Sequence, residues 1–251
     1  HMGAAGAAVA TVISQGMSGI LCLIYIAKKV PILHMKKDDW RPTGSLLKTQ
    51  VGIGIPMALQ YSITAIGTMM VQSSLNILGS TLVAAYTAAG KIEQIVTQAY
   101  VALGTTIATF GAQNMGAGNV PRIRQGFKAS TIIGVVYSFL AAALVMTVGK
   151  YMSYLFVSED VKLIMESVDI YLKCVGIFFI PLAIVNIYRN GIQGLGYGLL
   201  PMMAGVAELI GRGVAATIAA GQRSYLGVCL ASPTAWVLAA ALLIAMYYYI
   251  V

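Results

Sequence analysis

Long apolar stretches separated by short polar connections make up most of this 251-residue chain. A helix needs about 20 consecutive apolar residues to cross a hydrocarbon core of about 30 Å, and each stretch reaches that length. Because lipid offers the backbone no hydrogen-bond partners, such stretches are expected to be helices. The pattern therefore predicts an all-α integral membrane protein with about seven transmembrane helices. The expected spans are residues 4–27, 51–79, 82–111, 126–149, 168–194, 200–221 and 225–251.

The connections between the spans divide the chain into three parts. Residues 30–49 form a long polar connection with two prolines and a run of mixed charge, which is typical of a linker. We therefore expect a first transmembrane helix within residues 1–29, a cytoplasmic linker over 30–49 and a six-helix body over 50–251. The later connections are mostly short. Residues 150–167 alternate apolar and acidic positions, and they predict an interfacial helix on the outer face.

The excess of positive charge is explained by the expected topology. The chain has 16 Lys and Arg against 8 Asp and Glu, and clustered basic residues can indicate nucleic-acid binding. If residues 28–48 are cytoplasmic, however, the inner connections hold ten basic residues and the outer ones three, as the positive-inside rule requires. We therefore expect membrane lipid, not nucleic acid, around this multi-pass protein, in the plasma membrane of a bacterial cell. The inner residues are Lys28, Lys29, Lys36, Lys37, Arg41, Lys48, Arg122, Arg124, Lys128 and Arg189, and the outer ones are Lys150, Lys162 and Arg223.

The motifs that indicate an enzyme or a metal site are missing from the sequence. There is no G-x-x-x-x-G-K-[ST], H-E-x-x-H or G-x-S-x-G pattern, so an ATP-driven pump within this chain is not expected. Cys22, Cys174 and Cys229 stand singly in three apolar stretches, as small buried hydrophobic residues do. His1 and His34 both lie outside the expected spans. We expect no enzyme activity, no metal and no cofactor.

Two pairs of charges lie deep inside the expected spans. A charge at the centre of a membrane helix costs about 2.5–3.5 kcal/mol on insertion scales, so each should face a partner or water. Glu208 and Arg212 are four residues apart with the acid nearer the N-terminus, which favours an ion pair within one helix. That pair can be structural, or it can take part in gating. Lys91 and Glu93 project about 200° apart, so they cannot pair side by side.

Glu93 is the carboxylate for which we expect a functional role. It shares a helical face with Thr97 and Tyr100, a polar and aromatic lining that suits a cation. A carboxylate in a dry cavity can also exchange a proton near physiological pH. A structural bond between helices is the alternative. Lys91, on another face among Thr and Gln residues, is a second candidate for contact with a ligand.

Uncharged polar residues within the spans supply further candidates. Gln60, Tyr61 and Thr64 lie close together in the second span. Asn186 begins a polar stripe near the end of the fifth span. Such residues can bind a substrate or an ion, or they can join helices through hydrogen bonds worth about 0.6 kcal/mol each.

Prolines inside three spans predict bends. Each proline removes one backbone hydrogen bond of its helix and crowds the preceding turn. In a transporter such a bend can act as a hinge or open a cavity. Pro56 and Pro181 are therefore candidate hinges, with static kinks as the alternative, and Pro233 also lies within a span.

Five segments together resemble the multidrug and toxic compound extrusion (MATE) family of transporters. They are GAAGAAVATVISQG (residues 3–16), GIPMALQYSITAIG (54–67), LNILGSTLVAAYTAAGKIEQI (75–95), FGAQNMGAGNVPRIRQG (110–126) and YRNGIQGLGYGLLPMMAGVAELIGR (188–212). The first segment is similar to the last helix of the N-terminal half of the family, and the others are similar to its C-terminal half. The resemblance implies a fold of twelve helices in two six-helix lobes, and export of organic cations in exchange for H⁺ or Na⁺.

On this resemblance the chain holds family helices six to twelve and lacks most of the N-terminal lobe, which would be its partner. A first span that enters from outside likewise suggests a piece of a longer chain. Many family members carry carboxylates in helices seven and ten, where this chain has Gln60, Tyr61, Thr64 and Asn186. Glu93 is then the best candidate in this lobe for binding the coupling ion or the cation.

Two other functions fit parts of the pattern. A lipid or oligosaccharide flippase of the same superfamily would share the fold, although its cavity would be expected to hold more cationic residues than Lys91 and Arg212. A seven-helix receptor or retinal protein would share the number of spans. Retinal attachment needs a lysine in the last helix, and residues 225–251 contain none.

Overall fold

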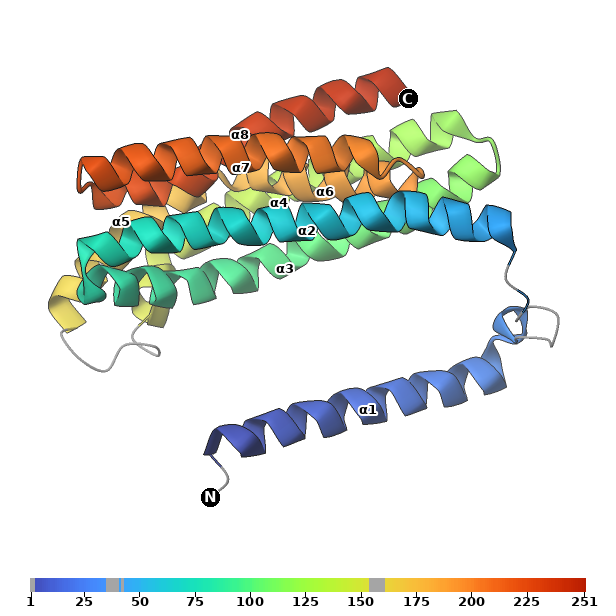
Figure 1. Ribbon diagram of the computed structural model, residues 1–251, viewed down its shortest axis with the longest axis horizontal. Helices are drawn as coiled ribbons and strands as arrows, with labels where there is room; N and C mark the ends of the chain where they lie inside the picture. The colour runs from blue at the N-terminus through green and yellow to red at the C-terminus, as the bar shows by residue number, and fades with distance from the viewer. Residues whose placement is uncertain (1–2, 35–40, 42, 154–160) are drawn as a thin grey trace. The chain divides into compact units, whose positions relative to one another are not determined.

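The computed structural model describes residues 3–34, 41, 43–153 and 161–251 (Figure 1). All regular elements in these residues are helical, which confirms the all-α prediction. Six helices are long and apolar enough to cross a membrane, and a bent pair brings the number of spans to seven. The elements are α1 (Gly3–Lys29), η1 (Pro31–Leu33), α2 (Gly44–Leu78), α3 (Ser80–Gly116), α4 (Val120–Ser153), α5 (Val161–Ile177), α6 (Phe179–Gly194), α7 (Leu199–Gly221) and α8 (Tyr225–Ile250).

The chain forms two compact units, His1–Thr49 and Gln50–Val251. The first unit contains α1, whose large apolar side chains are exposed along its length, for example Val12 at 71% and Leu21 at 62%. An apolar surface of this kind would be a liability in water, but it is ordinary for a helix surrounded by lipid or by other membrane helices. Its interpretation as the last helix of another lobe stays a prediction.

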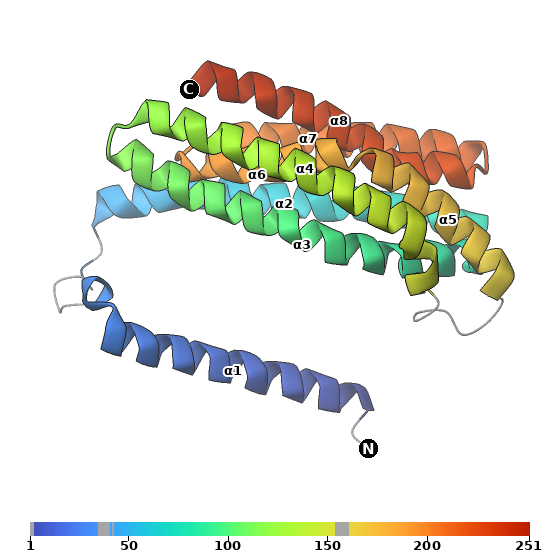
Figure 2. The ribbon, with the colours of Figure 1, turned by 180° about the vertical axis from the view of Figure 1, so that it is seen from behind.

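The second unit is a bundle of long helices that lie side by side (Figures 1 and 2). Helix α3 packs against α4, α5 and α6, and α8 packs against α5, α6 and α7. Tyr100, Phe127 and Phe179 are among the largest fully buried side chains of its core. Helix α2 meets α7 and α8 through a smaller apolar cluster that includes Leu75 and Ala216. Small residues let the backbones approach, as membrane packing requires.

The fifth expected span is broken into two helices. Helices α5 and α6 meet at Phe178 with a bend of 54°. Pro181 lies in the first turn of α6, where a missing amide proton is tolerated but where a continuous helix would lose a hydrogen bond. Pro56, by contrast, lies inside α2, which continues on both sides of it. Of the two candidate hinges, Pro181 is the one that accompanies a break.

The expected interfacial helix over residues 150–167 is wrong for the part that the structure describes. Residues 150–153 complete α4, residues 154–160 lie outside the described residues, and α5 already begins at Val161. Ile164, Met165 and Val168 of α5 are buried in the core of the bundle. Their spacing of three to four residues continues the apolar face of the span, so this segment belongs to the transmembrane body.

Two connections are tighter than the sequence suggested. Gly79 alone separates α2 from α3, and its φ of 108° is a conformation that residues with a Cβ rarely adopt. The basic residues of the next connection are not in a loop, because α4 begins at Val120. Arg122 and Arg124 therefore lie in its first two turns, where the amide of Arg122 donates to Oδ1 of Asn119 at 3.2 Å.

Candidate functional site

The two charges of α3 lie in different surroundings. Lys91 is exposed, whereas Glu93 is half-buried toward α5. This arrangement agrees with the large angle expected between them. No Lys or Arg in the described part of the chain comes within 4.0 Å of the Glu93 carboxylate. Glu93 is therefore a carboxylate deep in the bundle without an ion-pair partner of its own.

A tyrosine on α5 contacts the Glu93 carboxylate, and a second tyrosine packs against the first. The hydroxyl of Tyr171 on α5 donates a hydrogen bond to Oε2 of Glu93. The Tyr171 ring in turn meets the ring of Tyr86 edge to face, with 4.7 Å between the ring centroids. The expected contribution of Tyr100 is absent, since its hydroxyl lies 3.0 Å from the hydroxyl of Ser138 on α4. Neutral hydroxyls can stabilise a carboxylate by hydrogen bonding while leaving its charge uncompensated.

Glu208 is the centre of a buried charge cluster. Its Oε1 accepts from Nη2 of Arg212 at 2.5 Å within α7, which is the expected intrahelical pair. Its Oε2 accepts from Nη2 of Arg189 on α6, also at 2.5 Å. Counting Arg189 as a residue of an inner connection was therefore wrong, because it lies inside α6 and binds a carboxylate. The cluster holds two positive charges and one negative charge and joins α6 to α7.

A second polar contact joins α6 to α2. The side-chain amide of Gln193 on α6 donates to Oε1 of Gln60 at 2.8 Å, and Gln60 is 4% exposed. Close packing surrounds these groups. A Cβ on Gly205 would lie 3.2 Å from the Gln60 side chain, and one on Gly67 would lie 3.1 Å from Nη1 of Arg212. Gln60 thus joins helices within the lobe and is not free to bind a ligand in this conformation.

The remaining polar candidates do not converge on one point. Tyr61 is 63% exposed on α2. Thr64 is half-buried, and its hydroxyl donates back to the carbonyl oxygen of Gln60 at 3.0 Å. Asn186 is also half-buried, donating to the Leu182 carbonyl at 2.9 Å. In the described residues, no group of three or more His, Cys, Asp or Glu side chains is placed to hold a metal ion.

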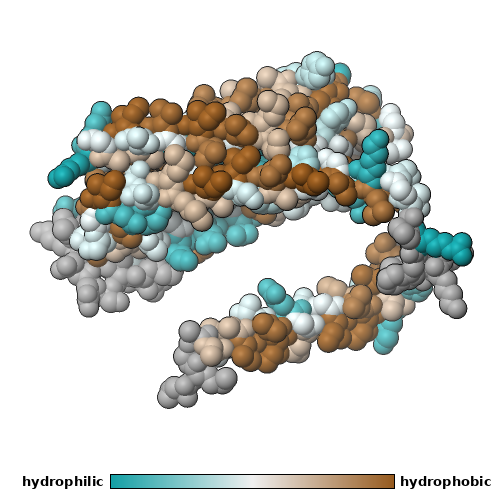
Figure 3. Space-filling model, viewed as in Figure 1, coloured by the Kyte–Doolittle hydropathy of each residue, from teal (hydrophilic) through white to brown (hydrophobic). Residues whose placement is uncertain are grey.

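One face of α3 is polar and exposed over most of its length. Its residues recur at intervals of three, four or seven, so they lie on one side of the helix. Hydrophilic atoms are visible along the edge of the bundle where α3 runs, while hydrophobic atoms cover much of α2 and α7 (Figure 3). Near one end of this face is a shallow hollow of about 460 Å³. The exposed polar residues are Thr87, Lys91, Gln94, Gln98, Thr105, Thr109 and Gln113.

Comparison with known proteins identifies the family. The family model MatE matches residues 53–217, well over half of the chain. The chain belongs to the MatE family. It is 32% identical over 195 residues to the probable multidrug resistance protein YpnP of Bacillus subtilis, a match that covers 76% of this chain and 42% of that protein. The chain thus spans less than half the length of this relative.

Solved structures of MATE transporters share the fold. A MATE protein crystallised in complex with MaL6 superimposes with a TM-score of 0.90 at 19% identity, covering 97% of this chain and 56% of that one. A transporter of the MOP superfamily from Pyrococcus furiosus gives a TM-score of 0.89, also at 19% identity, covering 97% and 55%. The binding pocket of that transporter is described as having reverse polarity, which suggests a different function for it.

In this MatE chain, sequence reasoning missed three residues that complete the polar contacts. Arg189 and Gln193 were visible as members of a polar stripe on the fifth span, but nothing in the sequence paired them with Glu208 and Gln60. Nothing in the sequence indicated that Tyr171 contacts a carboxylate, because a single tyrosine in a membrane helix is ordinary. Each partner lies on a different helix, so packing alone decides the contact.

Proposed function

We propose that this MatE chain is the C-terminal lobe of a secondary transporter that exports organic cations in exchange for H⁺ or Na⁺. The missing N-terminal lobe would complete it, since the chain spans less than half of YpnP. The names of its relatives, among them the probable multidrug resistance protein NorM of Thermotoga maritima and the multidrug export protein MepA of Staphylococcus haemolyticus, agree with this assignment. These bacterial relatives also support the plasma membrane of a bacterium as its location.

The exposed polar face of α3 supports a translocation pathway. A helix of 37 residues is about 55 Å long, about 25 Å more than the hydrocarbon core, so its middle turns lie at membrane depth. Gln94, Gln98 and Thr105 are exposed there, and polar groups of this kind do not face lipid without cost. Water in a cavity between this lobe and the N-terminal lobe would satisfy them.

The coupling proposal rests on the surroundings of the Glu93 carboxylate. A carboxylate with a tyrosine hydroxyl, but no described cation within 4.0 Å, can exchange between a bound proton, a metal cation and an organic cation. Deprotonated, it attracts a cation; when it takes up H⁺ or Na⁺ from outside, its attraction for the substrate falls. Because only a group whose interactions differ between two states can shift their equilibrium, Glu93 would link ion entry to substrate release.

The bend between α5 and α6 supplies a place where the lobe can change shape. Tyr171, the partner of Glu93, lies on α5, seven residues before the break at Phe178. A change in the protonation or the ligand of the Glu93 carboxylate would therefore act on α5, the helix that ends at the break. Pro181 prevents the full set of hydrogen bonds that would lock the two helices into one straight rod.

Exchange of Glu93 for Gln in the full-length transporter tests the proposal. Gln keeps the size and a hydrogen-bond acceptor for Tyr171 but removes the exchangeable charge. We expect ion-gradient-dependent efflux of ethidium from membrane vesicles to be abolished, with unchanged amounts of protein in the membrane. Glu166→Gln is the matched control, because this carboxylate is exposed on the neighbouring helix α5, and it should leave efflux unchanged. Export by Glu93→Gln at the parental rate and with the parental pH dependence would contradict the role of Glu93.

The position of Lys91 favours a second candidate function. This function is the transport of an anionic substrate such as a lipid or an oligosaccharide carrier. This lysine lies on the exposed polar face itself, whereas Arg212 is buried and paired with Glu208. Lys91→Gln separates the two functions in the same vesicles. If the substrate is a cation, this variant should keep or increase ethidium efflux, since a repulsive charge is removed. Loss of transport in this variant, with transport retained in Glu93→Gln, would support the anionic substrate.

A further inference from the structure

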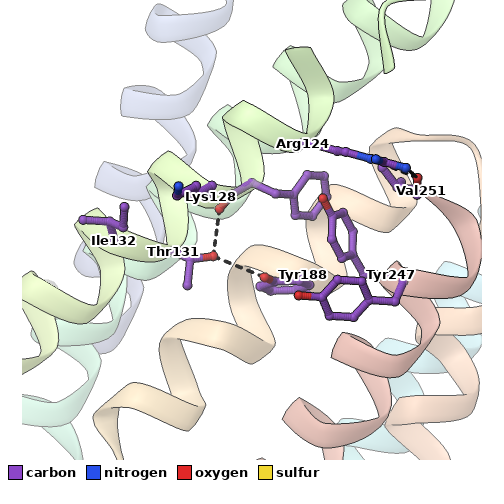
Figure 4. A pocket seen from close by; sticks show the side chains of 9 residues that line it. Arg124, Lys128, Thr131, Ile132, Tyr188, Tyr247 and Val251 are labelled. Carbon is purple, nitrogen blue, oxygen red and sulfur yellow. Dashed lines mark hydrogen bonds between the residues drawn. The ribbon is translucent and has the colours of Figure 1, made fainter. Parts of the chain in front are cut away.

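A pocket that does not include the polar face of α3 is not used by the proposed pathway. It has a volume of about 620 Å³ and is formed by α4, α6 and α8 (Figure 4). Small-molecule sites commonly have volumes of roughly 300–1,000 Å³, so this pocket has the size of a ligand site. Its lining combines basic, hydroxyl and aromatic side chains, among them Arg124, Lys128, Tyr188 and Tyr247.

The pocket holds two basic side chains, Arg124 and Lys128. Arg124 and Lys128 are four residues apart on α4, so their side chains lie on the same face. Two nitrogens of Arg124 donate to the backbone oxygen of Val251, which leaves its other guanidinium hydrogens free. Lys128 is exposed and has no recorded hydrogen bond. None of the described Asp or Glu side chains lies within ion-pair distance of either cation.

Hydroxyl groups line the inner wall of the pocket. Thr131 donates to the carbonyl oxygen of Phe127 at 2.8 Å and approaches the hydroxyl of Tyr188 at 3.4 Å (Figure 4). The Tyr188 proton has no recorded acceptor in the described residues, so it is available to a ligand. Tyr188 and Tyr247 meet edge to face at 5.3 Å, and Phe127 lies 4.5 Å from Tyr247, which fixes the ring positions. Two cations beside a free hydroxyl donor match the oxygens of a phosphate group.

The outer rim of the pocket is apolar and exposed. Ile132 is 54% exposed and Tyr248 is 78% exposed, and Val136, one turn beyond Ile132, is 55% exposed. In a membrane such side chains face acyl chains. Helix α4, with 34 residues, is about 51 Å long, so about 10 Å would extend past each side of a centred hydrocarbon core. Arg124 and Lys128 lie about 6 and 12 Å from its start, so they lie on the two sides of the boundary between the head groups and the hydrocarbon core.

We propose that this pocket binds the phosphate head group of an anionic phospholipid, with its acyl chains along the exposed apolar residues of α4 and α8. Arg124 and Lys128 would contact the phosphate oxygens, and the Tyr188 hydroxyl would donate to the same group. Basic pockets between transmembrane helices on the cytoplasmic side are suited to anionic lipids, and the positive-inside pattern assigns this end of α4 to the cytoplasm.

Native mass spectrometry of the purified full-length transporter, titrated with phosphatidylglycerol in detergent, tests the proposal. We expect Lys128→Gln and Arg124→Gln each to weaken binding of the first lipid about fivefold, the effect of one basic residue near a membrane surface. Arg122→Gln is the matched control. This arginine lies in the same part of α4, but its guanidinium is 5.5 Å from the Phe110 ring and does not line the pocket. The control should bind phosphatidylglycerol as the parent does.

Several outcomes would overturn the assignment. Equal loss in all three variants would mean that the lipid responds to the overall charge of this end and not to the pocket. Binding of zwitterionic phosphatidylcholine with the same affinity would remove the role of the anionic charge. Displacement of the lipid by an equal concentration of glycerol phosphate would indicate a site for a free phosphate. Lys128→Gln keeps the test interpretable if Arg124→Gln disturbs the contact with Val251, because Lys128 has no recorded partner to lose.

Discussion

The buried cluster around Glu208 makes a quantitative prediction. Glu208→Gln removes the single negative charge between Arg189 and Arg212 and leaves two guanidinium groups without a counter-ion. Arg212→Gln has a smaller effect, since Arg189 and Glu208 still form a pair. The double change Glu208→Gln with Arg212→Gln leaves one unpaired cation, Arg189. We therefore expect the double variant to be more stable than Glu208→Gln but less stable than Arg212→Gln.

The magnitudes follow from burial and distance. The side chains of Arg212, Glu208 and Arg189 are 5%, 6% and 14% exposed, so solvent screens them little. At an effective dielectric constant of 20, two unit charges about 4 Å apart interact by roughly 4 kcal/mol. Removal of one partner from a buried pair typically costs about 3–5 kcal/mol. For a chain of this size that is a decrease of roughly 6–20 °C in melting temperature for Glu208→Gln.

Thiol labelling during a temperature ramp can measure the order of stabilities. Cys229 is 1% exposed, so a maleimide dye that becomes fluorescent on reaction reports the loss of the fold. Cys22 is exposed and Cys174 is half-buried, so both could react before unfolding, and all variants should carry Cys22→Ser and Cys174→Ser. A double variant more stable than both single variants would mean that Glu208 and Arg212 form an isolated pair. A melting temperature of Arg212→Gln as low as that of Glu208→Gln would refute the role of Arg189.

Two further predictions concern topology and helix packing. A cysteine placed at Gln222, between α7 and α8, should react with an impermeant thiol reagent added outside the cell. A cysteine placed at Ala117, between α3 and α4, should be protected. The reverse pattern would overturn the assigned orientation. Gly194→Ala should lower the melting temperature strongly, because its Cβ would lie 2.3 Å from the carbonyl oxygen of Ala108, whereas Gly90→Ala, with no atom within 4 Å of the added Cβ, should be tolerated. Equal melting temperatures of the two glycine variants would show that α3 and α6 can separate at little cost.

The sequence was sufficient to locate the membrane helices. The expected span 82–111 lies within α3, and the expected span 200–221 lies within α7. The last expected span and α8 both begin at Tyr225. Apolar length is a reliable indicator here because lipid forbids unpaired backbone groups, so any long apolar stretch must be a helix. The helix ends were less well predicted, since polar residues can continue a helix beyond the hydrocarbon core without cost.

The break within the fifth span shows where local reasoning was incomplete. Pro181 predicted a bend, and the structure has one of 54° beside it. Pro56 gave the same indication, yet α2 continues through it. A proline removes one hydrogen bond in either position, but whether the helix then ends depends on the packing of the turns before and after it. The alternating pattern of residues 150–167 was misleading for the same reason, because its apolar positions in α5 pack into the core.

For the candidate site, the sequence by itself identified Glu93, Glu208 and Arg212 as charges that need partners, but it also grouped the exposed Lys91 with them and placed the buried Arg189 in a connection. The cost of a charge in lipid is a property of each residue and its depth, so Glu93, Glu208 and Arg212 could be identified from one chain alone. The spacing of Glu208 and Arg212 also determined their contact, because neighbours on one helix turn are local. Only the tertiary structure decided that Arg189 shares Glu208 and that Tyr171 binds Glu93. Those contacts join different helices, and their geometry follows from how the helices pack, which no local pattern in the sequence encodes.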